Sequence, residues 1–245
     1  MPKIDDQLQN VTARLRSAAL EAGRDPAQVA LVAASKAQPP QTILAAYRAG
    51  QRRFGENYVQ EALDKQAALS HLSDIEWHFI GPIQSNKTRV IAEHFAWVHS
   101  IDRIKTARRL SRQRPGHMPA LQVCLQVNLD GEAGKAGVAP EQLGELARTV
   151  HGLPGLHLRG LMALPKPRSR SAEQRQVFAR LRTLLETLNQ EGLTLDSLSM
   201  GMSGDLEAAV AEGATLVRIG SAIFGPRPIK KSPVTNANHT DTETP

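Results

Sequence analysis

Residues 29–36 read VALVAASK, an apolar run that ends on a serine and a lysine. A continuous apolar run of this length is too short to form a helix of its own and is typical of a parallel strand covered on both faces. Residues 4–22 before it place apolar side chains three to four positions apart and stop at Gly23, which predicts an amphipathic helix. We therefore expect a leading helix followed by the first strand of a parallel sheet.

The same unit, a short apolar run followed by a segment of helical period, repeats along most of the chain. Further strands are predicted over residues 52–55, 75–80, 96–99, 120–128, 156–163, 196–200 and 215–219. Helices are predicted between them over residues 41–49, 58–69, 85–94, 103–113, 140–151, 172–191 and 206–212. This alternation favours a closed (β/α)8 barrel of the TIM type over an open doubly wound sheet, so the predicted fold class is α/β.

Length and composition agree with one such barrel. The chain has 245 residues, of which 41% are hydrophobic and 22% charged, and this ordinary globular composition excludes disorder as the dominant state. A single α/β barrel typically needs about 250 residues. After Gly225 the sequence becomes rich in Pro, Thr, Asn and Lys and loses its apolar periodicity. We expect one barrel domain over residues 1–226 and a flexible tail over residues 227–245.

Charge and cysteine content bound the compartment and the partners. Thirty Lys and Arg against 24 Asp and Glu give a net charge of +6, which favours anionic partners, from nucleic acid to small phosphates. The single cysteine, Cys124, excludes an internal disulfide and is expected to be a buried, inert thiol. Neither a secretory signal nor a membrane-spanning run is visible, and the histidines lack the spacing of a metal site. We expect a cytoplasmic protein without a metal.

Lys36 is the first candidate functional residue, because chemistry in such barrels takes place at the carboxyl ends of the strands. Lys36 follows six apolar residues and Ser35, so the barrel would hold its amine with little water around it. Desolvation and nearby cations lower the pKa of a lysine and make its amine a nucleophile toward a carbonyl, as a Schiff base requires. The alternative is an ordinary lysine whose ammonium reaches solvent at a strand end.

Two turns of small residues follow the last two predicted strands. Residues 201–204 (GMSG) open a helix, and residues 219–221 (IGS) form a second turn at the neighbouring strand end. Barrels often bind phosphate at these adjacent loops, although glycine and serine also cap and turn chains without any ligand. Arg218 lies within an apolar stretch, where burial demands a hydrogen-bond acceptor. That acceptor would be a structural carboxylate or a ligand atom such as a ring nitrogen.

Several long blocks carry a resemblance that spans about residue 3 to Pro226. They read LVAASKAQP, FGENYVQEA, EWHFIGPIQSNK, VHSIDR, QVNLDGEAGKAGV, RGLMALP and LSMGMSGDLEAAVAEGATLVRIGSAIFG. In these blocks the chain resembles the YggS/PROSC family of pyridoxal phosphate (PLP) homeostasis proteins. The resemblance implies a barrel similar to the N-terminal domain of alanine racemase, with an extra N-terminal helix, that holds PLP.

The resemblance also implies a set of cofactor-binding residues: Lys36, Asn57, Met200, Ser203, Arg218, Gly220 and Ser221. By this resemblance Lys36 forms the Schiff base and Arg218 faces the pyridine nitrogen. The phosphate is held by Ser203, Gly220 and Ser221. Asn57 and Met200 would lie near the ring. An arginine can only donate a hydrogen bond, so it should keep the ring nitrogen unprotonated and restrain carbanion chemistry. The implied function is non-catalytic PLP homeostasis by a monomer, with transfer to PLP-dependent apoenzymes.

Two other functions are compatible with parts of the sequence. An amino acid racemase with weak turnover would need a second acid–base group, for which Tyr58, His78 and His99 are the candidates within the barrel. Nucleic-acid binding would use the basic side chains of residues 103–114, but the apolar positions of that segment predict a helix with an ordinary solvated face. Only 4% of residues are aromatic, and no RNA-binding module is present, so specific nucleic-acid recognition is not expected.

Overall fold

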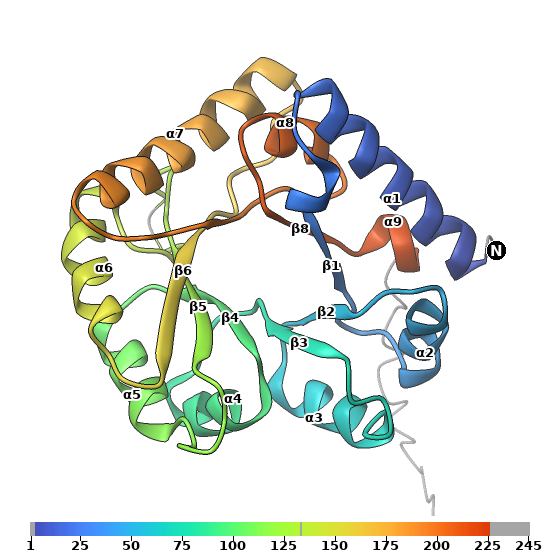
Figure 1. Cartoon of the computed structure of the whole chain (residues 1–245), viewed down its shortest axis with the longest axis horizontal. Helices are drawn as coiled ribbons and strands as arrows, with labels where there is room; N and C mark the ends of the chain where they lie inside the picture. Colours follow the sequence, from blue (N-terminus) through green and yellow to red (C-terminus); the bar gives the residue numbers. More distant parts are fainter. Residues whose placement is uncertain (1–2, 133, 226–245) are drawn as a thin grey trace, which may run out of the picture.

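The computed structural model describes residues 3–132 and 134–225. Its strands are all parallel and close into a barrel in the order β1-β2-β3-β4-β5-β6-β7-β8, with helices as an outer ring (Figure 1). The predicted (β/α)8 barrel is therefore confirmed. The tail that the sequence predicts over residues 227–245 lies outside the described residues.

The observed elements follow the predicted order. The strands are β1 (Ala30–Ala34), β2 (Arg53–Glu56), β3 (Glu76–Phe79), β4 (Trp97–Ile101), β5 (Leu121–Gln126), β6 (Leu156–Met162), β7 (Ser197–Ser199) and β8 (Leu216–Ile219). The helices are α1 (Ile4–Glu21), α2 (Pro40–Arg48), α3 (Val59–Ala68), α4 (Thr88–His94), α5 (Ile104–Gln113), α6 (Leu143–His151), α7 (Ser171–Gln190), α8 (Leu206–Ala211) and α9 (Ser221–Phe224).

Closure brings the first and last strands together. β1 pairs with β8 in a register that sets Ala33 opposite Ile219, and on its other side β1 pairs with β2, with Ala34 opposite Gly55. The carboxyl ends of parallel strands meet at one face, so residues that follow β1, β2, β7 and β8 become neighbours there. Segments far apart in the sequence thus form one edge of the barrel mouth.

The core is divided by the wall of the barrel. A large apolar cluster fills the space between strands and helices, where the outward-facing residues of each strand pack against the helical ring. A smaller cluster lies inside the barrel and consists of Val32, Trp97, Cys124, Met162 and Leu216. The prediction that Cys124 is buried is confirmed, and burial raises the pKa of its thiol to about 12. The thiol is therefore protonated at neutral pH.

The predicted leading helix, α1, is an addition to the ring of helices. It packs beside α8 and α9 at the outside of the barrel (Figure 1). Arg14 on this helix binds the Glu207 carboxylate through two hydrogen bonds, of 2.5 and 2.8 Å, and also donates to the backbone oxygen of Ser203 at 3.0 Å. The extra helix thereby holds the loop that precedes α8.

The structure differs from the sequence prediction at two places that bear on function. β4 runs on to Ile101, so His99 lies inside the barrel and not at the strand end. The strand continues because its polar side chains find buried partners: the Ser100 hydroxyl donates to the Gly81 carbonyl at 2.5 Å, and His99 is hydrogen-bonded on both ring nitrogens. The short helix α9, which begins at Ser221, was not predicted.

The basic segment at 103–114 forms α5 and its flanks. Most of its cationic side chains are exposed, whereas Ala107 and Leu110 are buried, as the solvated-face interpretation requires. Arg114 has a structural role, because its guanidinium donates to the backbone oxygens of Ala92 and Phe95 at 2.5 and 2.9 Å. Among residues 3–132 and 134–225, no helix is both long and apolar enough to cross a bilayer, and no cluster of His, Cys, Asp and Glu could hold a metal ion.

Candidate functional site

Lys36 stands at the mouth of the barrel, in the turn that directly follows β1. Successive side chains of a strand point to opposite faces, so Lys36 continues the face of Val32, whose side chain belongs to the cluster inside the barrel. The lysine is half-buried. The next residue, Ala37, has a positive φ of 62°, and its N–H donates to the Glu61 carboxylate at 2.5 Å. A side chain from α3 therefore fixes the turn that carries the lysine.

A buried ion pair supports this turn from outside the barrel. Lys65 on α3 donates to both oxygens of Glu56 at 2.8 and 2.9 Å and to the backbone oxygen of Ser35 at 2.8 Å. The Ser35 hydroxyl also donates to Glu56, at 2.5 Å. Burial raises the pKa of Glu56, and the charge of Lys65 opposes that rise. Sequence reasoning missed this pair, although the resemblance block FGENYVQEA contains the glutamate.

Asn57 follows β2 on the same face of the barrel. Its side-chain Oδ1 is buried and has no hydrogen-bond partner among the described residues. The backbone of Asn57 lies so close to Gly81 that a Cβ on that glycine would come within 2.3 Å of the Asn57 backbone oxygen. Only glycine permits this approach, which holds Asn57 in place. An orphaned buried acceptor beside the barrel mouth is a group that a bound ligand could satisfy.

The two predicted phosphate-binding turns lie side by side. The hydroxyl oxygens of Ser203 and Ser221 are 3.4 Å apart. Gly201 begins the first turn with a φ of +94°, and a Cβ there would lie 2.6 Å from the Cβ of Ala209, so the turn requires glycine. Gly220 is the residue before α9, whose first residue is Ser221. One hydroxyl from each turn therefore lies in the same small region.

Arg218 is buried inside the barrel just below these turns. Its Nη1 donates to the Ser199 hydroxyl at 2.5 Å, and its Nη2 donates to the backbone oxygen of Ala163 at 3.0 Å. Burial lowers the pKa of Arg218 to about 10, so the guanidinium keeps its charge at neutral pH. These acceptors are a hydroxyl and a carbonyl, not the carboxylate that the sequence left open as a structural partner.

The structure brings six of the seven candidate residues to one end of the barrel. A Cβ on Gly220 would lie 3.0 Å from the backbone oxygen of Ala34, two residues before Lys36, so the second serine turn begins beside the end of the strand that leads to Lys36. Met200 differs from the other candidates because its side chain is fully buried in the cluster between strands and helices. Its contact with a cofactor ring stays a prediction.

These residues fit a phosphorylated pyridine aldehyde. The arrangement supplies an amine at the mouth, two hydroxyls for a dianionic phosphate, a buried cation for an electron-rich ring atom, and an orphaned acceptor at Asn57. Each of these groups comes from a strand end, where the barrel wall holds it in place. The chemical composition of the site matches PLP, the cofactor implied by the resemblance.

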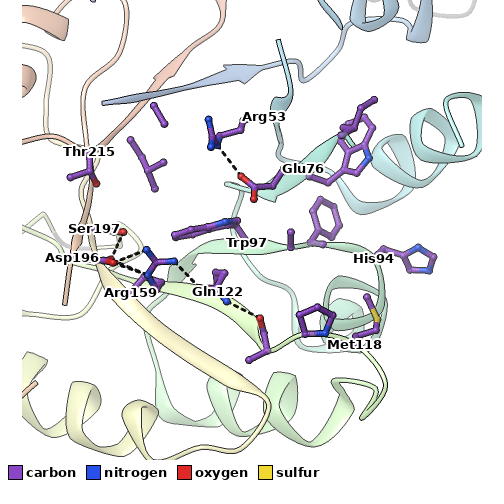
Figure 2. A pocket seen from close by; sticks show the side chains of 18 of the residues that line it. Arg53, Glu76, His94, Trp97, Met118, Gln122, Arg159, Asp196, Ser197 and Thr215 are labelled. Atoms are coloured by element: carbon purple, nitrogen blue, oxygen red, sulfur yellow. Dashed lines mark hydrogen bonds and ion pairs between the residues drawn. The ribbon is translucent and has the colours of Figure 1, made fainter. Parts of the chain in front are cut away.

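A hollow lies at the opposite end of the barrel, where the strands begin. It is a cavity of about 1060 Å³ with the indole of Trp97 in its wall (Figure 2). Two ion pairs line it: Arg53 donates to Glu76 at 3.0 Å, and Arg159 donates to Asp196 at 2.6 Å (Figure 2). No sequence argument pointed to this cavity, because its residues are spread over the first positions of most strands.

Comparisons with known proteins agree with the geometry. The family described as "Alanine racemase, N-terminal domain" matches residues 7–228. A protein of Pseudomonas aeruginosa named "Pyridoxal phosphate homeostasis protein" is 61% identical over 227 residues, which cover 93% of this chain and 97% of that protein. A protein of the same name from Escherichia coli K12 is 47% identical over 233 residues, covering 94% of this chain and all (100%) of the relative.

Solved structures show the same relationship. PipY of Synechococcus elongatus PCC7942, with PLP bound, superposes with a TM-score of 0.81 at 42% identity and covers 91% of this chain and 100% of its own. Alanine racemase from Corynebacterium glutamicum matches with a TM-score of 0.65 at 16% identity, over 91% of this chain and 62% of the racemase. At that identity the second likeness shows the fold alone.

Proposed function

This chain belongs to the pyridoxal phosphate homeostasis proteins, within the family of alanine racemase N-terminal domains, and from that premise we propose that it binds PLP in the service of PLP homeostasis. The relatives from Pseudomonas aeruginosa and Escherichia coli carry this name, and the structure of PipY was solved with PLP bound. The binding site is the cluster of strand-end residues at the barrel mouth. The cluster consists of Lys36, Asn57, Met200, Ser203, Arg218, Gly220 and Ser221.

One observation carries the proposal: the end of β1, two residues before Lys36, lies against Gly220, the residue before Ser221. A Cβ on Gly220 would nearly touch the Ala34 backbone, and the Ser203 and Ser221 hydroxyls lie 3.4 Å apart. An amine, a phosphate cradle and a buried cation are the groups that PLP needs for its aldehyde, phosphate and ring nitrogen. Lys36 would hold the aldehyde as a Schiff base.

Arg218 determines what chemistry the bound cofactor can do. PLP stabilises carbanions best when its ring nitrogen is protonated, because the pyridinium then accepts the negative charge. The Arg218 guanidinium can only donate a hydrogen bond, so it favours an unprotonated ring nitrogen. This favours storage of the cofactor over turnover. We therefore propose a binder without catalytic residues that buffers a reactive aldehyde and passes it to PLP-dependent apoenzymes.

The structure gives little support to the racemase alternative. Of the side chains considered as a second acid–base group, His78 and His99 are fully buried inside the barrel, where their ring nitrogens are hydrogen-bonded to Glu76, to each other and to Ser199. Tyr58 is exposed beside Asn57. It is the one group of the three that stands outside the barrel interior, so a Tyr58→Phe variant is the test of residual proton exchange.

Further parts of the proposal rest on the resemblance and composition. We propose that residues 1–226 form a single PLP-binding domain, that the protein acts as a monomer in the cytoplasm, and that it has no specific nucleic-acid partner. Light scattering of the purified protein with and without PLP tests the oligomeric state. Transfer of PLP to an apoenzyme, followed by recovery of that enzyme's activity, tests delivery.

Borohydride reduction tests the binding site. The purified protein is loaded with PLP, reduced, digested and mapped by mass spectrometry. We expect a visible absorption band before reduction and a phosphopyridoxyl group on Lys36 afterwards. A Lys36→Ala variant should lose the band, whereas the matched control Lys105→Ala, which removes an exposed lysine of α5, should retain it. Absence of the band from the native chain, or labelling on other lysines alone, would contradict the proposal.

A further inference from the structure

A continuous chain of hydrogen bonds runs through the inside of the barrel from the cofactor end to the opposite cavity. It starts where the Arg218 Nη1 donates to the Ser199 hydroxyl at 2.5 Å. Ser199 Oγ lies 2.6 Å from His99 Nδ1, and His99 Nε2 lies 2.9 Å from His78 Nδ1. The chain ends at Glu76 Oε1, 2.9 Å from His78 Nε2. Strands β8, β7, β4 and β3 each contribute.

The two ends of the chain determine the direction of every bond in it. A guanidinium can only donate, so Ser199 accepts from Arg218 and uses its own proton to donate to His99 Nδ1. An ionised carboxylate can only accept, so His78 donates to Glu76 from Nε2 and accepts at Nδ1 from His99 Nε2. All donors therefore point from the cation toward the carboxylate, and both histidines are neutral. Aligned chains of this kind reinforce one another.

The surroundings favour the neutral histidines. The side chains of His78, His99 and Ser199 are fully buried, and Trp97 stacks on His78 with 5.5 Å between ring centroids. Burial lowers the pKa of both histidines; the nearby Arg53 lowers that of His78 further while Glu76 opposes it. His78 and Arg218 add to the lowering at His99. Cys124, the remaining titratable group of the interior cluster, is protonated.

The Glu76 carboxylate prevents Ser199 from facing two hydrogen-bond donors at once. If its carboxylate were absent, His78 could take the other tautomer and donate from Nδ1 to His99, which would then donate from Nδ1 to Ser199. Ser199 would face two donors, His99 and Arg218, and its own proton would lose its acceptor. The carboxylate at the far cavity therefore keeps the hydroxyl available to Arg218.

We propose that Ser199 and His99 are positioning residues for the cofactor site: through this chain, anchored at Glu76, they hold the Arg218 guanidinium in the orientation that meets the ring nitrogen. The inference rests on the proposed function and adds residues that do not touch the cofactor. It also links the mouth to the opposite cavity, where Glu76 and Arg53 are exposed to whatever enters between the strand starts (Figure 2).

Variants along the chain test the inference. Ser199→Ala removes one heavy atom, as does the matched control Cys124→Ala, which alters the same interior without touching the chain. His99→Phe removes both links at its position, whereas His99→Asn keeps an acceptor near the place of Nδ1. Glu76→Leu removes the anchor. Each variant is loaded with PLP, and its affinity and the pH dependence of its visible absorption are measured, with urea unfolding as a check of folding.

We expect Ser199→Ala and His99→Phe to bind PLP about tenfold more weakly. In Ser199→Ala the charged Arg218 loses its acceptor, and in His99→Phe the Ser199 hydroxyl loses the acceptor that orients it toward Arg218. Their absorption should also change over a different pH range, since the ring nitrogen no longer meets a fixed donor. His99→Asn should restore most of the affinity, Glu76→Leu should shift the pH range in the same direction as Ser199→Ala, and Cys124→Ala should match the native protein.

The outcomes separate this inference from the proposed function. Folded Ser199→Ala and His99→Phe proteins with the native affinity and pH range would overturn the inference, even though Lys36 still carries PLP. Equal losses in Cys124→Ala would also overturn it, because the effect would then arise from general loosening of the barrel. If the native chain does not carry PLP on Lys36, the proposed function fails, and the inference fails with it.

Discussion

The Lys65 ammonium lies 2.8 Å from the Glu56 carboxylate, and both groups are sealed from solvent behind the turn that carries Lys36. The same ammonium donates to the Glu61 carboxylate at 2.5 Å, and Glu61 accepts from the backbone N–H of Ala37. The position of Lys36, the proposed cofactor-binding lysine, therefore depends on a charge cluster between the barrel wall and α3. A site at the mouth is built partly from groups on the outside of the barrel.

Removal of one member of this cluster should destabilise the protein. Lys65→Met leaves the Glu56 carboxylate buried without its cation, which typically costs about 3–5 kcal/mol of unfolding free energy. Lys65→Met combined with Glu56→Gln should lose less than the single variant, because the fully buried carboxylate is gone and the remaining Glu61 is partly exposed to solvent. Urea unfolding of native, single and double variants measures both values. A single variant within about 0.5 kcal/mol of native would contradict the role of the pair.

The paired hydroxyls of Ser203 and Ser221 should contribute to phosphate affinity. Hydrogen bonds to charged groups contribute about 1.5–3 kcal/mol each, so Ser203→Ala or Ser221→Ala should weaken PLP binding about tenfold or more. Binding of pyridoxal, which lacks the phosphate, should change little in either variant. Titrations of both compounds followed by absorbance make the comparison. An equal loss for pyridoxal would place the effect elsewhere than at the phosphate.

Removal of the contact between Arg14 on α1 and the turn of Ser203 should lower the affinity for PLP. Arg14→Met breaks the bonds to Glu207 and to the backbone oxygen of Ser203, but these groups are partly exposed, so the stability loss should be only about 1 kcal/mol or less. The PLP dissociation rate should rise several-fold because the turn loses its brace. The exposed Arg16→Met on the same helix is the control. Equal rates in both variants would refute the brace.

The buried histidines predict an acid-sensitive stability. His78 and His99 have a pKa below the ordinary 6.5 in the folded chain, whereas they regain it on unfolding. The unfolded state therefore binds more protons as the pH falls below about 6.5, and stability should decrease by up to about 1.4 kcal/mol per pH unit for each histidine. Above pH 7 this contribution is fully present. Urea unfolding between pH 4.5 and 8, in roughly half-unit steps, measures the slope.

The His78→Gln, His99→Asn double variant shows whether the slope arises from these rings. It should be less stable at neutral pH but should lose much less stability between about pH 6.5 and 4.5. Subtracting its pH profile from the native one removes the carboxylates, which titrate in both proteins. Parallel profiles would mean that the two buried histidines do not set the acid sensitivity.

The barrel could be predicted because its strands carry a local signal. Runs such as residues 29–34 are apolar throughout, since a parallel strand inside a ring of helices is covered on both faces. Strand ends with polar side chains were harder: His99 and Ser100 look like the end of a strand, yet β4 includes them because both find buried hydrogen-bond partners. A pattern of hydrophobicity cannot register a partner that lies far away in the sequence.

The candidate site could be predicted only at positions where the residue type and its neighbours in the sequence indicate a chemical role. A lysine after a buried strand and serines in glycine-rich turns point to an amine and an anion site. Lys65 carries no such signal, because a charged residue on an amphipathic helix is expected to face solvent. The chain from Arg218 to Glu76 was hidden for the same reason as the end of β4: its members lie on four strands, and only closure makes them neighbours.

The pairing of β1 with β8 has a consequence for the biosynthesis of the protein. Lys36 leaves the ribosome early, but the turn of Ser221 emerges only after nearly all of the barrel has been made, and the two come together when the last strand inserts beside the first. A nascent or truncated chain has the reactive amine without the phosphate cradle. If PLP is held as proposed, its stable retention requires the finished, closed barrel, and an incomplete chain should release it.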